Sequence, residues 1–332
     1  MLAAQLHGPR PIEDGPLKIA SVPDPNPRPG ELLIRVRACG ICHTDLHTVE
    51  GDIDVPRLPL IPGHQIVGVV EAAGDASSYQ PGARVGAAWL HRTCGQCLFC
   101  RRGDENLCLR AEFTGLDADG GYAELYAADS EFVYSIPSGF SDLQAAPLLC
   151  GGVIGYRALK ISALRPGGRI ALYGFGASAH IVIQIARHWG SEVYVFTRGA
   201  EHQRLARELG AAWVGRAGDP PPNKVDAAII FAPAGALVLD ALNVLERGGT
   251  VALAGITMSP IPEIDYGKIY HERKIASVAN ATRRDAEELL QLAATIPIRT
   301  EVESFPLTAA NEALRKLKHG AMRGAGVIDM SR

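Results

Sequence analysis

The sequence predicts an α/β protein of two domains, one β-rich and one built on a doubly wound parallel sheet. The chain has 332 residues, which at about 150 residues per domain corresponds to roughly two domains. Up to about residue 135, short β-like runs such as Glu31–Arg37 and Ile66–Glu71 are separated by proline and glycine turns. After that point helical and strand-like stretches alternate, which is typical of a doubly wound parallel sheet.

The alternation predicts the individual elements of the second half of the chain. Helices are expected at Leu143–Leu164, Ala179–Trp189, Gln203–Leu209 and Gly235–Glu246. Strands are expected at Arg169–Tyr173, Glu192–Thr197, Val225–Phe231 and Thr250–Ala254, with an exposed loop at Asp219–Pro222. Two later helices, Arg284–Ala294 and Ala309–Leu317, and a strand at Gly326–Asp329 are assigned to the β-rich domain. The predicted β-rich domain therefore covers residues 1–148 and 284–332, and the parallel-sheet domain covers 149–283.

Composition excludes several classes of function. Hydrophobic residues make up 47% of the chain and charged residues 21%, which are ordinary values for a folded protein. The net charge of −3 offers no field that would attract nucleic acid or an anionic membrane. The longest uncharged run, Ile170–Ala186, contains glycine, serine, histidine and glutamine, so it is not expected to span a bilayer. The N-terminus lacks a basic segment before an apolar one, so no secretory signal is expected and a cytoplasmic location is predicted.

Four of the seven cysteines form one compact cluster in the sequence. Cys94, Cys97, Cys100 and Cys108 have the spacing C-x2-C-x2-C-x7-C. Four thiolates suit a closed tetrahedral site, so the cluster predicts a structural zinc ion. Free structural cysteines are a weaker alternative, because no apolar run surrounds them. An iron–sulfur cluster is disfavoured, because the ferredoxin pattern has three residues before its last cysteine and a proline after it.

A second set of metal-binding residue types is dispersed along the chain. It comprises the segments Gly40–His47 and Ile61–Gln65, which contain Cys42 and His64, and the distant Cys150. These segments resemble the zinc-containing alcohol dehydrogenases of the medium-chain dehydrogenase/reductase superfamily, and the resemblance covers nearly the whole chain. It implies a GroES-like catalytic domain followed by a Rossmann nucleotide-binding domain, assembled as a homodimer or homotetramer.

The resemblance also assigns roles within the second set. Cys42, His64 and Cys150 match the three ligands of a catalytic zinc, which would bring the total to two zinc ions per chain. Three protein ligands leave one coordination position open for an alcohol. Thr44 matches the hydroxyl that contacts the substrate oxygen. His47 matches the base that passes the proton to solvent.

Four neighbouring residues have weaker assignments. Asp45 matches a carboxylate behind His64, where it would fix the tautomer of the imidazole. His43 is either a contact of the cofactor phosphate or a surface group. Cys39 matches no ligand and is interpreted as a packed thiol. Gln65 stands where many relatives have glutamate, so that carboxylate is not available here.

A phosphate-binding turn follows the first strand of the parallel-sheet domain. Gly174 and Gly176, together with Ala177 and Ala179, give the pattern G-x-G-x-x-A between a predicted strand and a predicted helix. In this context Gly174 permits the tight turn and Gly176 lets the backbone approach a pyrophosphate. The pattern predicts a bound dinucleotide.

Cofactor choice is predicted from the end of the next strand. Enzymes that use NAD place an acidic residue there, whereas this chain has Thr197 and Arg198. A hydroxyl and a guanidinium suit a 2′-phosphate, so NADP(H) is preferred in this interpretation. The alternative is that Arg198 is a solvated surface charge and both cofactors are accepted.

The substrate pocket is assigned by resemblance to Trp89 and Ile53, although Trp89 is equally plausible as a core residue. Two large side chains would favour primary or small, apolar alcohols and aldehydes, and the predicted substrate is a primary or allylic alcohol. The predicted function is therefore a zinc-dependent alcohol dehydrogenase that uses NAD(P)⁺. Alternatives are a polyol or secondary-alcohol dehydrogenase, a zinc-free quinone or enoyl reductase, and a non-catalytic protein that binds zinc and nucleotide.

Overall fold

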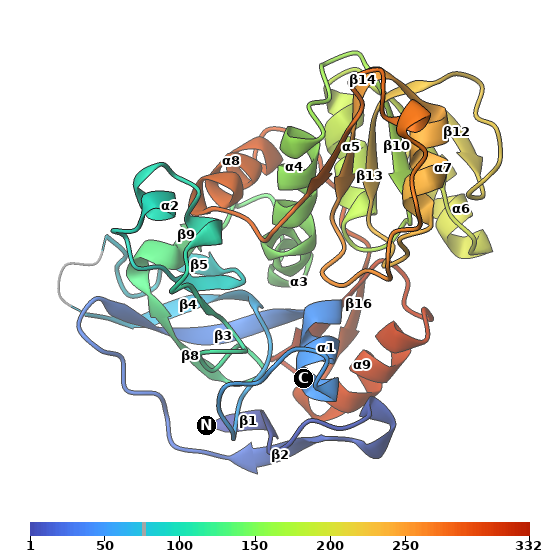
Figure 1. Cartoon of the computed structure of the whole chain (residues 1–332). Helices are drawn as coiled ribbons and strands as arrows, with labels where there is room; N and C mark the ends of the chain where they lie inside the picture. The colour runs from blue at the N-terminus through green and yellow to red at the C-terminus, as the bar shows by residue number, and fades with distance from the viewer. Residues whose placement is uncertain (75–77) are drawn as a thin grey trace. The chain divides into compact units, whose positions relative to one another are not determined.

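The computed structural model describes residues 1–74 and 78–332 of the chain (Figure 1). These residues form two compact units, Met1–Cys150 with Thr282–Arg332, and Gly151–Ala281. Both boundaries lie two residues from those expected from the sequence. A 3₁₀ helix over Ala146–Leu149 keeps Leu149 with the first unit, and Thr282 caps a helix of that unit.

The first unit is β-rich. Its strands are β1 (Leu2–Leu6), β2 (Leu17–Ser21), β3 (Glu31–Ile41), β4 (Gln65–Ala73), β5 (Arg84–Ala87), β6 (Leu90–Arg92), β7 (Glu112–Phe113), β8 (Leu125–Asp129), β9 (Val133–Ser135), β16 (Val302–Phe305) and β17 (Ala325–Asp329). Its helices are α1 (His43–Glu50), α2 (Leu98–Arg101), α3 (Asp142–Ala145), α8 (Arg283–Ala293) and α9 (Ala310–Lys318). The main sheet has seven strands in the order β16-β17-β3-β4-β5-β9, with β8 also paired to β3.

Strand β3 organises this unit and positions the residues that follow it. Ile34, Val36 and Ala38 are buried while the arginines between them are exposed, which is the alternation expected of a strand with one face on the core. Antiparallel pairing brings Gly40, near the end of β3, opposite Gln65 at the start of β4. Cys42 and His64, which lie just beyond this pair, are therefore held next to each other by the register of the sheet.

The second unit contains a six-stranded sheet. Its strands are β10 (Arg169–Tyr173), β11 (Glu192–Phe196), β12 (Trp213–Gly215), β13 (Val225–Ile230), β14 (Leu245–Leu253) and β15 (Lys274–Ser277), and its helices are α4 (Gly151–Ile161), α5 (Ala179–His188), α6 (Ala200–Glu208) and α7 (Leu237–Val244). The strand order is β12-β11-β10-β13-β14-β15, and every pair is parallel. The order reverses beside β10, where ligands bind in doubly wound sheets. The predicted fold class is confirmed.

The expected continuous helix over Leu143–Leu164 is wrong. The segment is divided into α3, the 3₁₀ helix Ala146–Leu149 and α4, with Cys150 between the last two. Pro147 lies in the first turn of the 3₁₀ helix, and a proline has no N–H for the preceding turn of a longer helix. The break leaves Cys150 outside regular helix, at backbone angles φ −136° and ψ −70°.

Two short strands of the six-stranded sheet were not expected from the sequence. Strand β12 has three residues and β15 has four, and they form the two edges of the six-stranded sheet. Runs this short show little periodicity, so their pairing with β11 and β14 decides their conformation. Among the residues that the structure describes, no helix combines the length and the apolar character needed to cross a bilayer.

Candidate metal centres and cofactor site

Cys42, His64 and Cys150 meet in the first unit although 108 positions separate the two cysteines. Cys42 precedes α1, His64 precedes β4, and Cys150 follows the 3₁₀ helix Ala146–Leu149. The ligand atoms of the three residues lie within 4.8 Å of one another. The two sulfur atoms are 3.7 Å apart.

The Asp45 carboxylate lies behind the imidazole of His64. Its Oδ1 is 2.8 Å from Nδ1 of His64, and its Oδ2 accepts the backbone N–H of Cys42 at 2.8 Å. Burial disfavours the charged imidazole, but the charge and hydrogen bond of Asp45 outweigh it and raise the pKa of His64 to about 10. Since Nδ1 is bound to Asp45, the opposite ring nitrogen, Nε2, points toward the sulfur atoms of Cys42 and Cys150.

This donor set fits a zinc ion. Nε2 of His64 is buried and has no hydrogen-bond partner among the described residues, which is costly unless another group occupies that position. The neighbouring Cys150 thiol holds the pKa of Cys42 well below its usual value, so that Cys42 is disposed to be a thiolate. Two thiolates and one imidazole are typical of a zinc site that keeps one position open for a substrate.

The other site residues predicted on α1 differ in their burial and in their contacts. Thr44 is buried, and its hydroxyl lies 3.7 Å from the Cys42 sulfur. His47 is half-buried, and its Nδ1 is 2.8 Å from Oδ2 of Asp52, a contact that the sequence analysis missed. His43 is exposed, with its ring 6.4 Å from that of His47.

An aromatic pair lies beside the cluster. The ring of Trp89 is edge-on to that of His64 with centroids 4.9 Å apart, and it stacks on Phe113 at 5.1 Å. Trp89 is therefore next to a candidate metal ligand. Phe113 carries no motif and could not be assigned from the sequence. Ile53 is half-buried in the loop after α1, and its assignment to a pocket stays a prediction.

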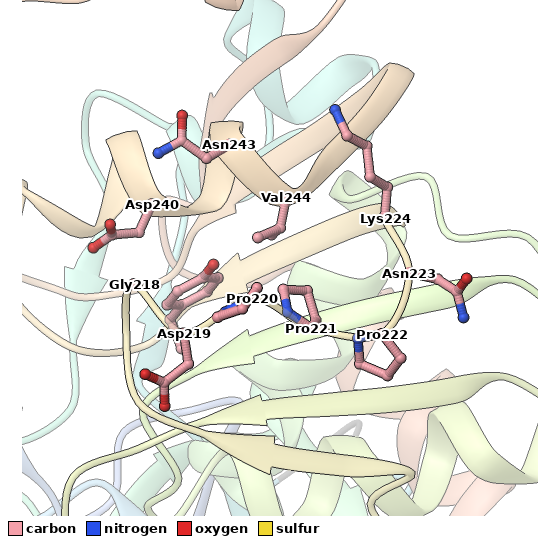
Figure 2. A pocket seen from close by; sticks show the side chains of 11 residues that line it. Gly218, Asp219, Pro220, Pro221, Pro222, Asn223, Lys224, Asp240, Asn243 and Val244 are labelled. Atoms are coloured by element: carbon pink, nitrogen blue, oxygen red, sulfur yellow. The ribbon is translucent and has the colours of Figure 1, made fainter.

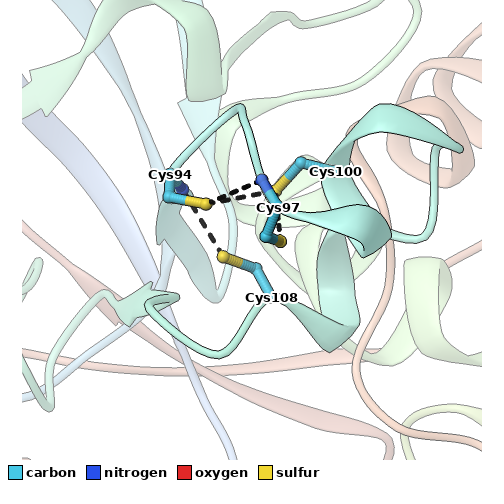
Figure 3. Close-up of side chains that lie close together, drawn as sticks. All are labelled: Cys94, Cys97, Cys100 and Cys108. Atoms are coloured by element: carbon cyan, nitrogen blue, oxygen red, sulfur yellow. Dashed lines mark hydrogen bonds between the residues drawn. The ribbon is translucent and has the colours of Figure 1, made fainter.

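The four clustered cysteines form a second candidate metal centre (Figure 3). Their sulfur atoms all lie within 4.8 Å of one another. The backbone N–H of Cys97 donates to the Cys94 sulfur at 3.3 Å, and that of Arg110 donates to the Cys108 sulfur at 3.4 Å. Backbone N–H groups of Gln96 and Cys97 lower the pKa of Cys94 to about 5. Four sulfurs at this spacing fit a closed tetrahedral zinc site.

The predicted phosphate-binding turn lies where the sequence places it, between β10 and α5 of the second unit. Gly174 has φ +87°, which L side chains rarely adopt, and a Cβ there would lie 3.2 Å from the backbone nitrogen of Ala232. Gly176 is exposed, and a Cβ there would have no atom within 4 Å. The backbone at Gly176, just before α5, is thus open to a ligand, as a dinucleotide pyrophosphate requires.

Thr197 and Arg198 directly follow β11, the strand that pairs with β10. Thr197 is buried, and its carbonyl accepts a hydrogen bond from Gln203 at 3.0 Å. Arg198 is exposed. This places a guanidinium at the end of the strand that contacts the adenosine ribose in doubly wound nucleotide-binding domains.

A cavity of about 390 Å³ lies in the second unit under the connection from β12 to β13 (Figure 2). It is lined by Tyr173, Gly218, Asp219, Pro220, Pro221, Pro222, Asn223, Lys224, Asp240, Asn243 and Val244. From the sequence, Asp219–Pro222 is predicted only as an exposed loop. The hydroxyl of Tyr173 is buried and has no hydrogen-bond partner among the described residues. Burial and the nearby Asp240 carboxylate raise the pKa of Tyr173.

Replacing Tyr173 by phenylalanine is expected to raise the free energy of unfolding by about 1 kcal/mol, because the change removes a buried polar atom without a partner. The ring should keep its stack on Phe196, whose centroid is 4.4 Å away. Chemical denaturation monitored by circular dichroism measures the effect. A loss of 1 kcal/mol or more would contradict the expectation and would mean that the hydroxyl has a polar partner in the cavity.

Comparison with known proteins agrees with this geometry. Residues 28–138 match the family model described as the alcohol dehydrogenase GroES-like domain, and residues 179–295 match that of zinc-binding dehydrogenases. The chain is 48% identical to a probable alcohol dehydrogenase, AdhA, of Mycobacterium tuberculosis, over 99% of this chain and 97% of the relative. It is 37% identical to an alcohol dehydrogenase of Geobacillus stearothermophilus, over 94% and 96% of the two chains.

Solved structures give the same result. The alcohol dehydrogenase of the archaeon Aeropyrum pernix is 29% identical, with a TM-score of 0.88 over 99% of this chain and 100% of that one. The fold and the relatives together define a two-domain zinc-binding dehydrogenase. The chain belongs to the zinc-containing alcohol dehydrogenases of the medium-chain dehydrogenase/reductase superfamily, as its motifs predicted.

Proposed function

We propose that this alcohol dehydrogenase interconverts primary or allylic alcohols and their aldehydes, with hydride transfer to or from NADP(H) in preference to NAD(H). The observation that carries the proposal is the cluster of Cys42, His64 and Cys150, whose ligand atoms lie within 4.8 Å. Nε2 of His64 has no partner among the described residues. A three-ligand zinc site of this kind serves catalysis, because one coordination position is left for substrate.

These three residues would hold the catalytic zinc, and the protein's own groups would prepare it. A bound zinc ion supplies Lewis acidity, which lowers the pKa of an alcohol hydroxyl towards neutrality. Asp45 accepts a hydrogen bond from Nδ1 of His64 and thereby keeps the lone pair of Nε2 directed at the metal position. With zinc bound, Cys42 and Cys150 would both be thiolates, and their two negative charges would moderate the charge of the site.

Thr44 and His47 would handle the substrate proton. The Thr44 hydroxyl, close to the Cys42 sulfur, would take the proton that the alcohol loses while it releases its own proton towards His47. His47 would then pass the proton to solvent, and its contact with Asp52 supports this role because the Asp52 side chain is 56% exposed. The hydride would pass to a cofactor held by Gly174, Gly176, Ala177 and Arg198, with His43 as a further phosphate contact.

The substrate class rests on the surroundings of His64. The Trp89 ring, whose centroid is 4.9 Å from that of His64, supports an apolar wall next to the reacting carbon. Together with Ile53 this wall would favour unbranched or allylic carbons over polyols, which need hydrogen-bond partners for their additional hydroxyls.

The second zinc, held by Cys94, Cys97, Cys100 and Cys108, would be structural. Its four sulfurs complete a tetrahedral shell and leave no position for substrate. The holoenzyme would therefore contain two zinc ions per chain. By resemblance it would be a cytoplasmic homodimer or homotetramer.

Replacing Arg198 by alanine is expected to raise KM for NADP⁺ by roughly 10- to 100-fold and to leave KM for NAD⁺ within about twofold. A hydrogen bond between charged groups contributes about 1.5–3 kcal/mol, and only NADP⁺ carries the 2′-phosphate that would accept it. Steady-state kinetics with each cofactor measures the change.

Arg204→Ala is the matched control for that experiment, because Arg204 is an exposed arginine of α6 that pairs with Glu201 and Glu208. It should change neither KM. Equal losses for both cofactors in the Arg198 variant would contradict the assignment of Arg198 to the 2′-phosphate.

The proposed function is tested by following nicotinamide absorbance with a panel of primary, allylic, secondary and polyhydric alcohols. Each alcohol is assayed with NAD⁺ and NADP⁺ separately, before and after chelation. Chelator-sensitive turnover that is fastest with primary or allylic alcohols and NADP⁺ is expected. Turnover confined to polyols or secondary alcohols would move the enzyme to the other substrate class.

A further inference from the structure

A buried tyrosine that carries no metal-ligand motif contacts the candidate catalytic centre from a distant part of the chain. Tyr122 has no exposed surface, and its hydroxyl donates a hydrogen bond to Oδ2 of Asp45 at 3.2 Å. The other oxygen of Asp45 is the one that holds Nδ1 of His64. Tyr122 is thus one hydrogen bond removed from the imidazole, through a carboxylate.

The backbone of the same segment holds the chain that leads into His64. The N–H groups of Gly120, Gly121 and Tyr122 donate to the carbonyls of residues 61, 63 and 62 at 2.6, 2.8 and 3.0 Å. Three consecutive residues are therefore tied to the three residues that precede His64. This fixes the direction in which the backbone delivers the imidazole.

Glycines make this close approach possible. Gly63 has φ +96°, and a Cβ on it would lie 2.4 Å from the Cδ1 atom of Tyr122. A Cβ on Gly120 would lie 2.0 Å from the carbonyl oxygen of Gly63. Real Cβ atoms do not approach so closely, so larger residues at these positions would push the two segments apart.

Hydrogen bonds to both oxygens fix the orientation of the Asp45 carboxylate. Oδ2 receives two donors, the Tyr122 hydroxyl and the Cys42 backbone N–H, while Oδ1 faces His64. Two donors on one oxygen prevent the carboxylate from rotating about its Cβ–Cγ bond. Burial raises the pKa of Tyr122, which keeps its hydroxyl protonated as a donor.

We propose that Tyr122 is a positioning residue for the catalytic metal, acting on His64 through Asp45 and through the backbone of residues 61–63. This inference rests on the proposed function, because it requires Cys42, His64 and Cys150 to bind zinc. Tyr122 does not contact substrate in this account. Its hydroxyl fixes the carboxylate that fixes the imidazole, so its effect should appear in metal affinity before it appears in chemistry.

Tyr122→Phe tests the role of the hydroxyl, because the ring and the backbone contacts are retained. Zinc affinity of the three-ligand site is measured by competition with a chromophoric chelator. We expect it to fall about fivefold, the effect of losing one hydrogen bond. The four-cysteine site of the same protein should retain its zinc affinity. A ¹H–¹⁵N NMR spectrum of the zinc-loaded protein should show a changed signal for the Nδ1–H group of His64, because the carboxylate that accepts its hydrogen bond has lost one of its donors.

Tyr126→Phe is the matched control. Tyr126 lies four residues further along, in β8, and is also buried; its hydroxyl contacts Nδ1 of His91 at 3.0 Å and the Thr114 hydroxyl at 3.3 Å. Removing that hydroxyl is expected to leave both zinc affinities and the Nδ1–H signal of His64 unchanged. A general loosening of the sheet would affect the two variants alike, whereas a positioning role affects only Tyr122→Phe.

The outcomes distinguish a failure of the positioning role from a failure of the proposed function. If the unmodified protein binds two zinc ions and turns over alcohol, but Tyr122→Phe retains its zinc affinity and its His64 Nδ1–H signal, the positioning role alone is refuted. If the unmodified protein binds zinc only at the four cysteines, the proposed function and the positioning role both fail. A selective fivefold loss in Tyr122→Phe supports the inference.

Discussion

Cys150→Ser is expected to abolish alcohol oxidation, with a loss in kcat/KM of at least about a thousandfold, while the fold is retained. A serine hydroxyl stays protonated near neutral pH, so it would not replace the thiolate that completes the three-ligand site with Cys42 and His64. Cys150 lies between two helices rather than within one, so the change should not disturb regular structure. Zinc content by mass spectrometry should fall from two ions per chain to one.

Cys39→Ala is the control for this experiment. Cys39 is fully buried in the core of the first unit. Its thiol donates a hydrogen bond to the carbonyl of Gly40, at a sulfur–oxygen distance of 3.7 Å. This variant should keep two zinc ions and most of its activity. Full activity in Cys150→Ser would show that Cys150 is not a ligand.

Cys97→Ser is expected to act chiefly on stability. None of the four residues of α2 is buried, so the segment around the four cysteines lacks apolar packing of its own. A metal ion would then supply most of the energy that orders this segment, and its loss should cost about 4 kcal/mol. The corresponding fall in Tm is roughly 10 °C for a unit of this size, measured by differential scanning calorimetry.

Leu98→Ala provides the comparison, since Leu98 is the next residue and its side chain is 67% exposed. It should leave Tm within about 1 °C. At temperatures well below its Tm, Cys97→Ser should retain activity, because its three-ligand site is intact. An unchanged Tm for Cys97→Ser would contradict the structural role of the four-cysteine site.

Much of the fold was predictable, because it follows from local pattern. The alternation of buried and exposed residues in β3, and the strand–glycine–helix order around Gly174, both indicated the observed elements. The break at Pro147 could also have been predicted, since proline ends a helix. Strands β12 and β15 could not, because they depend on neighbouring strands rather than on their own sequence.

Some residues of the candidate site were also predictable from the sequence, and others were not. Cys42, His64, Cys150 and the four clustered cysteines were identified by residue type, spacing and resemblance, and the structure brings each set together. Tyr122 is 77 positions from Asp45, and no spacing rule connects a tyrosine with a carboxylate at that separation. Such contacts are created by tertiary packing, so they could be recognised only in the structure.

The central claim is that the zinc ion held by Cys42, His64 and Cys150 is the one that would activate the alcohol for oxidation by NAD(P)⁺. Stepwise chelation of the holoenzyme, with turnover plotted against zinc ions bound per chain, tests it most directly. The three-ligand site should lose its metal first, so turnover should fall to zero as the content drops from two ions to one and return when zinc is restored. Turnover that persists with one ion per chain would contradict the claim.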